Sequence, residues 1–177
     1  VQTGVAGMTN GVVYNLGQTV GAVGYAIRGG ALTQCDFVTT ACATAANWIP
    51  IANDIVGLRA QYGRDTTATA IDSVDQWTQI GSSAPPASPS ACDLIKIRAI
   101  RLVLVARNPQ FEKTDVTGVT GGAPAPTWVG DTVTTDNPVA ALINLSADAS
   151  WKQYRYKTFQ AIVPIRNAVY AAGGSGC

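Results

Sequence analysis

The sequence predicts an α+β fold in which β-strands predominate and one short helix covers residues 51–62. Three features favour this fold class. Short β-branched runs alternate with glycine turns near the start of the chain, one segment has helical periodicity, and the last long segment alternates as a strand does. A chain of 177 residues suits one domain, so we expect residues 1–177 to form a single globular unit.

The first predicted strands lie on either side of a glycine turn. Apolar residues occupy every second position at Val23, Tyr25 and Ile27, as expected for a strand with two different faces. Gly29 and Gly30 follow, and the stretch "ALTQ" continues beyond them. We therefore expect two short strands here, separated by the glycine pair.

The predicted helix rests on the spacing of apolar residues in "WIPIANDIVGLRAQYGRD". They recur at i, i+4, i+7 and i+11, which puts them on one helical face. These residues are Ile51, Ile55, Leu58 and Tyr62. Pro50 suits the first turn of such a helix, and Gly63 suits the position just past its end.

Residues 93–108, "DLIKIRAIRLVLVARN", predict a helical turn that leads into a central strand. The second half of this segment is short and rich in β-branched residues. One face of the strand carries Ala99, Arg101, Val103 and Val105, and the opposite face carries Ile100, Leu102 and Leu104. The Pro/Ser/Ala-rich stretch 80–92 and the long stretch 109–138 are predicted loops.

The closing segment at 151–170, "WKQYRYKTFQAIVPIRNAVY", predicts a strand. Its side chains alternate strongly from Tyr154 to Phe159. Pro164 lacks the N–H that a strand ladder needs, so it belongs at a sheet edge or at a bulge. Residues 139–151 before it are expected to form a short strand or a turn.

Charge and hydropathy argue against two classes of protein. A net charge of +1 with 13% charged residues lacks the basic stripe of a nucleic-acid binder, so we expect no nucleic-acid partner. The most apolar run, at 95–106, is interrupted by Arg98 and Arg101 and is too short to cross a bilayer. The sequence starts at Val1 without a methionine, and we expect that an upstream segment has been removed.

Four cysteines, an even number, favour disulfides and an oxidising compartment: Cys35, Cys42, Cys92 and Cys177. Cys35 and Cys42 enclose the turn-like stretch "CDFVTTAC", so we predict a local hairpin disulfide there. Cys92 with Cys177 would then close a long loop and hold the C-terminal tail. Three connectivities are possible, and four free thiols are the alternative.

The chain contains no histidine, which removes the commonest catalytic schemes. Ser-His-Asp and Cys-His catalysis are excluded, and the cysteine spacing does not fit a zinc site. Asp65, Asp72 and Asp75 are interpreted as turn and cap residues rather than as glycosidase carboxylates. The same stretch offers oxygen ligands but lacks the pattern of a calcium-binding loop. We expect neither an enzyme nor a cofactor.

The tryptophans offer stacking surface for a sugar ring, although tryptophans are more often partly buried in cores or interfaces. They are Trp48, Trp77, Trp128 and Trp151. A secreted carbohydrate-binding module is therefore one alternative function.

Three stretches share their order and spacing with a known family. They are "IPIANDIVGLRAQYGRDT" (49–66), "IKIRAIRLVLVARN" (95–108) and "WKQYRYKTFQAIVPIRNAVY" (151–170). Together they resemble the globular part of PilW-type minor pilins of bacterial type IV pili. The resemblance covers most of residues 11–170, although the loop 109–138 matches nothing specific in that family.

The resemblance implies an α+β pilin head, mostly antiparallel sheet, packed on an N-terminal helix that this sequence lacks. That helix would anchor the head in the inner membrane, on its periplasmic side, until assembly carries it out to the pilus tip. A non-catalytic role is implied, in a tip or priming complex with other minor pilins, the major pilin and a PilY-type tip adhesin. A minor pseudopilin of a type II secretion system shares these features and is the nearest alternative.

We also predict that the closing segment faces a partner subunit. Its alternation gives the strand two different faces, and Pro164 keeps part of the edge from pairing freely. Arg166 and Asn167 are expected to bond backbone groups that the edge leaves open. The residues predicted for this contact are Tyr154, Arg155, Tyr156, Lys157, Arg166 and Asn167.

Overall fold

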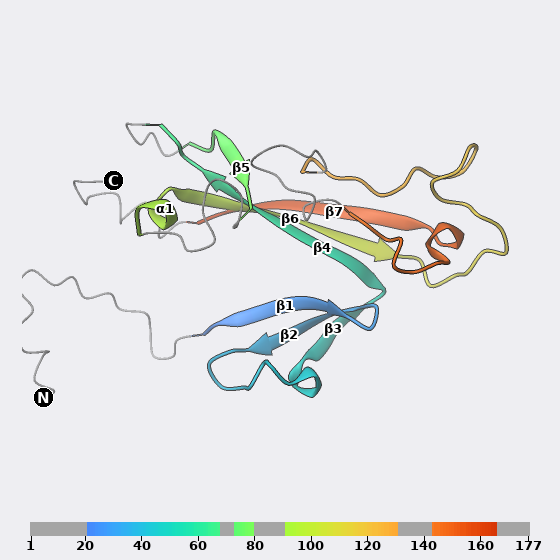
Figure 1. The fold of residues 1–177 in the computed structure, drawn as a ribbon, viewed down its shortest axis with the longest axis horizontal. Coiled ribbons are helices and arrows are strands. Elements are labelled where there is room, and N and C mark those ends of the chain that lie inside the picture. The colour runs from blue at the N-terminus through green and yellow to red at the C-terminus, as the bar shows by residue number, and fades with distance from the viewer. Residues whose placement is uncertain (1–20, 68–72, 80–90, 131–142, 166–177) are drawn as a thin grey trace, which may run out of the picture.

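The computed structural model describes residues 21–67, 73–79, 91–130 and 143–165. In these residues the strands form two antiparallel sheets that meet at the end of one long strand (Figure 1). The first sheet has the order β1-β2-β3, formed by Val23–Arg28, Ala31–Asp36 and Ile49–Asn53. The second has the order β5-β4-β6-β7, formed by Gln76–Thr78, Ile55–Arg64, Ile97–Arg107 and Tyr156–Pro164.

Helical structure is sparse in the described residues. The helix α1 spans only Ala91–Ile95, and short 3₁₀ turns lie at Ala45–Asn47 and Trp151–Gln153. The prediction of a mostly antiparallel β fold is therefore confirmed, whereas the α+β label is confirmed only in part.

The β1–β2 hairpin has the predicted glycine turn. Gly29 and Gly30 have φ of 57° and 75°, in the left-handed region that glycine adopts at little cost. Two consecutive residues of this kind make the tight turn whose twist suits an antiparallel hairpin. Arg28 and Ala31 accordingly form the last register pair before the turn.

The predicted hairpin disulfide joins Cys35 to Cys42, and both residues are buried. The Trp48 indole closes the loop, because its Nε1 donates to the Cys42 carbonyl at 2.9 Å while the Arg28 guanidinium lies 4.5 Å from the ring centroid. Within the loop, the N–H of Val38 donates to the Asp36 carboxylate, which lowers the pKa of that group.

The second predicted disulfide is not tested by the structure. The side chain of Cys92 and the whole of Cys177 lie outside the described residues, so this pair remains a prediction.

The predicted helix at 51–62 is wrong, because this segment forms part of β3 and most of β4. Between them Asp54 has φ of 56°, and this bend passes the chain from one sheet into the other. β4 bonds to β5 on one side and to β6 on the other. These long-range pairings, together with the stiff branched side chains of Ile55 and Val56, outweigh a local helical spacing.

Residues 91–107 follow the predicted order of a helical turn and then a central strand. α1 leads into β6, which pairs with β4 and with β7. The register aligns Leu58, Leu104 and Phe159 in one row across β4, β6 and β7, and Arg59, Val103 and Gln160 in the next. Neighbouring rows point to opposite faces of the sheet, so the predicted division of β6 into two faces is confirmed.

The core lies on the face that carries Val103 and Val105, both fully buried. Trp128 packs against Val103 from the irregular segment that follows β6, with only 6% of its surface exposed. Gly57 in β4 lies directly under Val105, since a Cβ at that position would come within 2.9 Å of the valine methyl. Part of the long predicted loop therefore serves as the cover of this face.

A polar contact crosses the same face between the two central strands. The fully buried Gln61 accepts a hydrogen bond at 2.5 Å from Nε of Arg101. The Arg101 guanidinium lies 4.5 Å from the Trp77 ring centroid and 5.5 Å from that of Trp128. Partial burial lowers the pKa of Arg101, and the aromatic rings offset some of the desolvation through cation–π attraction.

Replacing Cys35 and Cys42 by serine together should lower the free energy of unfolding by about 2–3 kcal/mol, because the open loop gains conformational entropy in the unfolded chain. Urea denaturation of the oxidised protein and of the double variant checks this prediction. Equal transition midpoints would contradict it. As a control, a reductant should lower the midpoint of the unmodified protein by opening this disulfide, and the double variant should not show that shift.

Replacing Arg101 by leucine should lower the free energy of unfolding by about 2–3 kcal/mol, because buried Gln61 loses a charged donor and two tryptophan rings lose their cation. The matched control is Arg155→Leu at an exposed arginine, which should change stability by less than about 0.5 kcal/mol. Similar losses for the two variants in thermal unfolding would show that the buried contact has no special role.

Candidate interaction surface

The face of the four-stranded sheet opposite Val103 is accessible in the part of the chain that the structure describes. Three successive rows of the register cross it, each with one residue from β4, β6 and β7. They are Leu58, Leu104 and Phe159, then Ala60, Leu102 and Ala161, then Tyr62, Ile100 and Val163. None of these residues is buried, so the described residues leave an apolar sheet face without a cover.

The first sheet converts part of this face into a groove. Tyr25 of β1 and Leu32 of β2 lie across from the leucines of β4 and β6 and enclose a volume of about 360 Å³. The residues that line this apolar groove are Tyr25, Leu32, Leu58, Ala60, Leu102, Leu104, Phe159, Gln160 and Ala161. Such a lining suits contact with another apolar surface rather than proton transfer or metal binding.

No described strand pairs with the outer edge of β7. β7 pairs with β6 on its inner side, and Arg155 accepts from Asn108 N–H while Ile165 donates to the Arg98 carbonyl. Arg155 and Ile165 are both odd-numbered, and the register between them has no bulge. All odd-numbered residues of β7 therefore point their backbone N–H and C=O groups toward β6. The backbone groups of Thr158, Gln160 and Ile162 consequently point outward. Pro164 follows the same parity, so its missing N–H falls on the free edge, as predicted.

Large apolar side chains lie along this edge on both faces. Phe159, Ile162 and Val163 have 53%, 64% and 49% of their surface exposed. Lys157 and Pro164 stand at the two ends of the stretch, and no charged residue lies between them.

The predicted partner-facing residues divide into two groups. Tyr154 and Tyr156 contact their own chain: the Tyr154 ring packs edge-on against Phe111 at 5.5 Å, and the Tyr156 hydroxyl donates to the Trp151 carbonyl at 2.8 Å. Desolvation raises the pKa of Tyr156. Both tyrosines therefore have contacts within their own chain near the start of β7, and their contact with a partner stays a prediction.

Arg155 and Lys157 are the exposed members of the predicted set. Arg155 lies 3.5 Å from Glu112 in an exposed ion pair. Lys157 lies over the Phe159 ring at 5.6 Å, and no carboxylate among the described residues pairs with it. Arg166 and Asn167 lie outside the described residues.

Arg107 anchors the segment that leads into β7. Its guanidinium contacts Asp148 at 3.2 Å and Asp54 at 3.7 Å and lies 4.4 Å from the Tyr154 ring centroid. The hydroxyl and N–H of Ser150 donate to Asp148 and, with Arg107 nearby, lower the pKa of its carboxylate. The bend at Asp54 is thereby tied to the segment that leads into β7.

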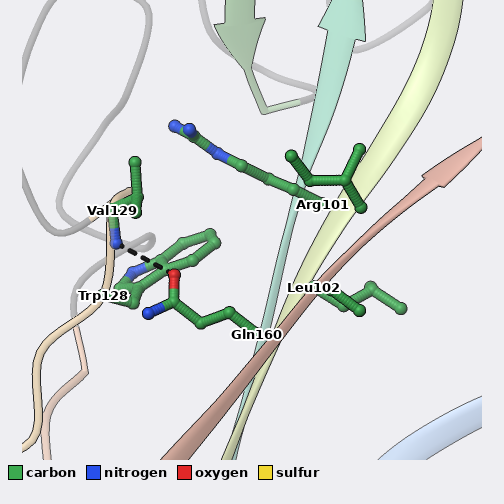
Figure 2. Close-up of a pocket in the computed structure, with 7 residues that line it drawn as sticks. Arg101, Leu102, Trp128, Val129 and Gln160 are labelled. Atoms are coloured by element: carbon green, nitrogen blue, oxygen red, sulfur yellow. Dashed lines mark hydrogen bonds between the residues drawn. The ribbon is translucent and has the colours of Figure 1, made fainter.

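A smaller pocket of about 270 Å³ lies beside β7 on the covered face (Figure 2). The Gln160 amide oxygen accepts from Val129 N–H at 3.3 Å, which holds the covering segment next to the strand. Trp128 lies between this segment and the sheet, and its ring is almost fully buried. The pocket therefore offers no exposed aromatic platform for a sugar.

The other tryptophans are engaged in a similar way. Trp48 has Arg28 over its ring, Trp77 shares Arg101 with Trp128, and Trp151 has Lys152 at 5.9 Å. These contacts do not favour the carbohydrate-binding alternative.

Of the aspartates predicted to act in turns and caps, Asp65 makes a local turn contact, whereas Asp75 bonds to a residue nine positions earlier. Asp65 accepts from Thr67, and Asp75 accepts from the N–H and hydroxyl of Thr66. Asp72 lies outside the described residues. Across the described ranges, no cluster of three potential metal ligands is found, and none of the helices there has the length and hydropathy to span a membrane.

The sequence predicted partner contact near the start and beyond the end of β7, and that contact stays a prediction; it did not single out the most exposed part of the strand. The residues beyond Lys157, from Thr158 to Val163, form the open edge, and the leucine face of β6 forms the groove. The available signal was the uncharged stretch "TFQAIV" between a lysine and a proline.

Comparisons with known proteins address the family. The sequence matches the family described as Type IV Pilus-assembly protein W (PilW) over residues 25–167. No curated protein matches the chain. One similar solved structure is a type IV-like pilin from Thermus thermophilus, with 20% identity over 91% of this chain and 75% of that one and a TM-score of 0.40, an overlap too weak to support further argument.

The family match begins within β1, continues through β7, and includes the groove and the outer edge of β7. It contains the stretches 49–66 and 95–108 in full and the stretch 151–170 as far as residue 167. The chain therefore belongs to the type IV pilus-assembly protein W family.

Proposed function

We propose that this chain is the head of a non-catalytic minor pilin, a subunit of the tip or priming complex that initiates type IV pilus assembly and helps to display a tip adhesin. Family membership supports association with pilus components and a periplasmic or pilus-associated location. The proposed partners are other minor pilins, the major pilin and a PilY-type tip adhesin. Before assembly, the head would be held at the inner membrane by an N-terminal helix.

The apolar groove is the observation that carries this proposal. Exposed apolar surface costs roughly 25 cal/mol per Å², so a soluble head gains stability when such a groove is covered. Leu58, Leu102 and Leu104 present an aliphatic floor, and Tyr25 and Leu32 supply a wall from the other sheet. A helix with one apolar face fits this kind of groove. The N-terminal helix proposed above is the natural occupant, since it would join the head to the filament.

Replacing Leu104 by glutamate should reduce the number of surface pili by at least about tenfold. A carboxylate in the middle of the groove would have to be desolvated when a helix packs there, and that cost opposes assembly. Electron microscopy of cells and the yield of sheared pili measure the effect.

The matched control is Val38→Glu, which places the same charge at an exposed valine in the Cys35–Cys42 loop, away from both the groove and β7, and should leave pili unchanged. Formation of the Cys35–Cys42 disulfide in the full-length protein reports that each variant is folded. Normal piliation by the Leu104 variant would contradict the proposal. Loss of type II secretion with intact pili in a deletion strain would instead favour the pseudopilin alternative.

A further inference from the structure

We propose that the free edge of β7 receives a strand from a different pilus subunit, which extends the sheet β5-β4-β6-β7 beyond β7. The partner strand would be apolar opposite Phe159 and Val163 and would carry a carboxylate opposite Lys157. We name residues 158–163 the edge window. The inference rests on the proposed function only in taking the partner to be another subunit of the pilus.

The backbone supplies the first argument. Thr158, Gln160 and Ile162 point their N–H and C=O groups away from β6, and among the described residues no backbone group bonds to them. A partner strand can therefore add regular ladder hydrogen bonds without disturbing the β6–β7 pairing. Main-chain bonds of this kind provide affinity, and side chains at alternate positions provide specificity.

The lack of edge protection supplies the second argument. Soluble proteins usually defend an edge strand with charges, prolines or bulges, because an unprotected edge pairs with other chains. Within β7 itself, the charge and the proline that could protect the edge are Lys157 and Pro164, one at each end, and the register between β6 and β7 has no shift. The edge window itself is uncharged and carries exposed Phe159, Ile162 and Val163. These ends limit the paired stretch to about the length of a short strand.

The side chains indicate the chemistry of the partner. Phe159, Ala161 and Val163 end the three rows of the open face, so an added strand would continue those rows by one residue each. An aromatic or branched residue opposite Phe159 and opposite Val163 gives favourable cross-strand pairs. On the same face Lys157 lies one row further on, without a carboxylate partner in the described chain.

The charge of Lys157 favours a different protein over a second copy of this chain. In any antiparallel pairing of two β7 edges, Lys157 would lie opposite a residue from the same segment. No residue from 154 to 165 is acidic, so no such register places a carboxylate there. A partner strand with an aspartate or glutamate at that position neutralises the lysine and fixes the register.

The test uses the full-length protein co-expressed with the other pilin subunits of its own pilus and purified as a complex in detergent. Backbone hydrogen exchange is measured by mass spectrometry for the complex and for the full-length protein alone. We expect the peptide that covers the edge window to exchange at least tenfold more slowly in the complex. Unchanged exchange in this peptide within an intact complex would overturn the inference but leave the proposed function standing.

Two substitutions separate backbone pairing from side-chain contact. Ile162, like Pro164, points its backbone N–H away from β6, so Ile162→Pro should leave the hydrogen bonds between β6 and β7 intact. It removes a donor to the partner strand and should therefore weaken the complex about tenfold or more. Ile162→Val keeps the N–H and should bind nearly as the unmodified protein does. Equal affinity of the proline and valine variants would overturn strand addition. The Cys35–Cys42 disulfide and the thermal transition report folding in both.

Lys157→Glu tests the predicted carboxylate, and Lys157→Arg is its control. The glutamate variant should weaken the complex about tenfold at low salt, and the difference should shrink as salt screens the charges. No effect of charge reversal would reject the acidic partner. Light scattering that shows a homodimer of this protein, with slow hydrogen exchange in the edge window of that homodimer, would also overturn the inference. Failure to form any complex would remove the proposed function and the inference together.

Discussion

The antiparallel pairing of β4 with β6 is the interaction on which the rest of the structure depends. β4 continues from β3 through the bend at Asp54, so this one strand joins the two sheets. β6 lies between β4 and β7 and sets the register of both. Because side chains alternate across a strand, this register also decides which residues share a face. The core, the groove and the free edge all follow from it.

Among the described residues, the two faces of the four-stranded sheet differ in how far they are covered. On one face the chain covers itself, with Val103 and Val105 under Trp128 and with Arg101 bound to Gln61 between tryptophan rings. On the other face leucines and Phe159 remain accessible in the apolar groove. A face that is closed by its own chain stabilises the head, while an apolar face left open requires a second element. This asymmetry is the physical basis of the proposed role as a subunit of an assembly.

Phe159 belongs to both of the surfaces for which we propose partners. Its ring lines the groove proposed for a helix and ends the row that a partner strand would extend. Arg107 supports the same region, because its contacts with Asp54 and Asp148 connect the bend between the sheets to the segment before β7.

Local chemistry in the sequence determined several elements by itself. The glycine pair at 29–30, the hairpin disulfide from Cys35 to Cys42 and the two faces of β6 all depend on residues close together in the chain. Tertiary structure alone decided that 51–62 is extended, because β4 gains partners on both sides from distant segments. It also decided which face of β6 is covered: valines and leucines are both apolar, and only the path of residues 108–130 distinguishes them.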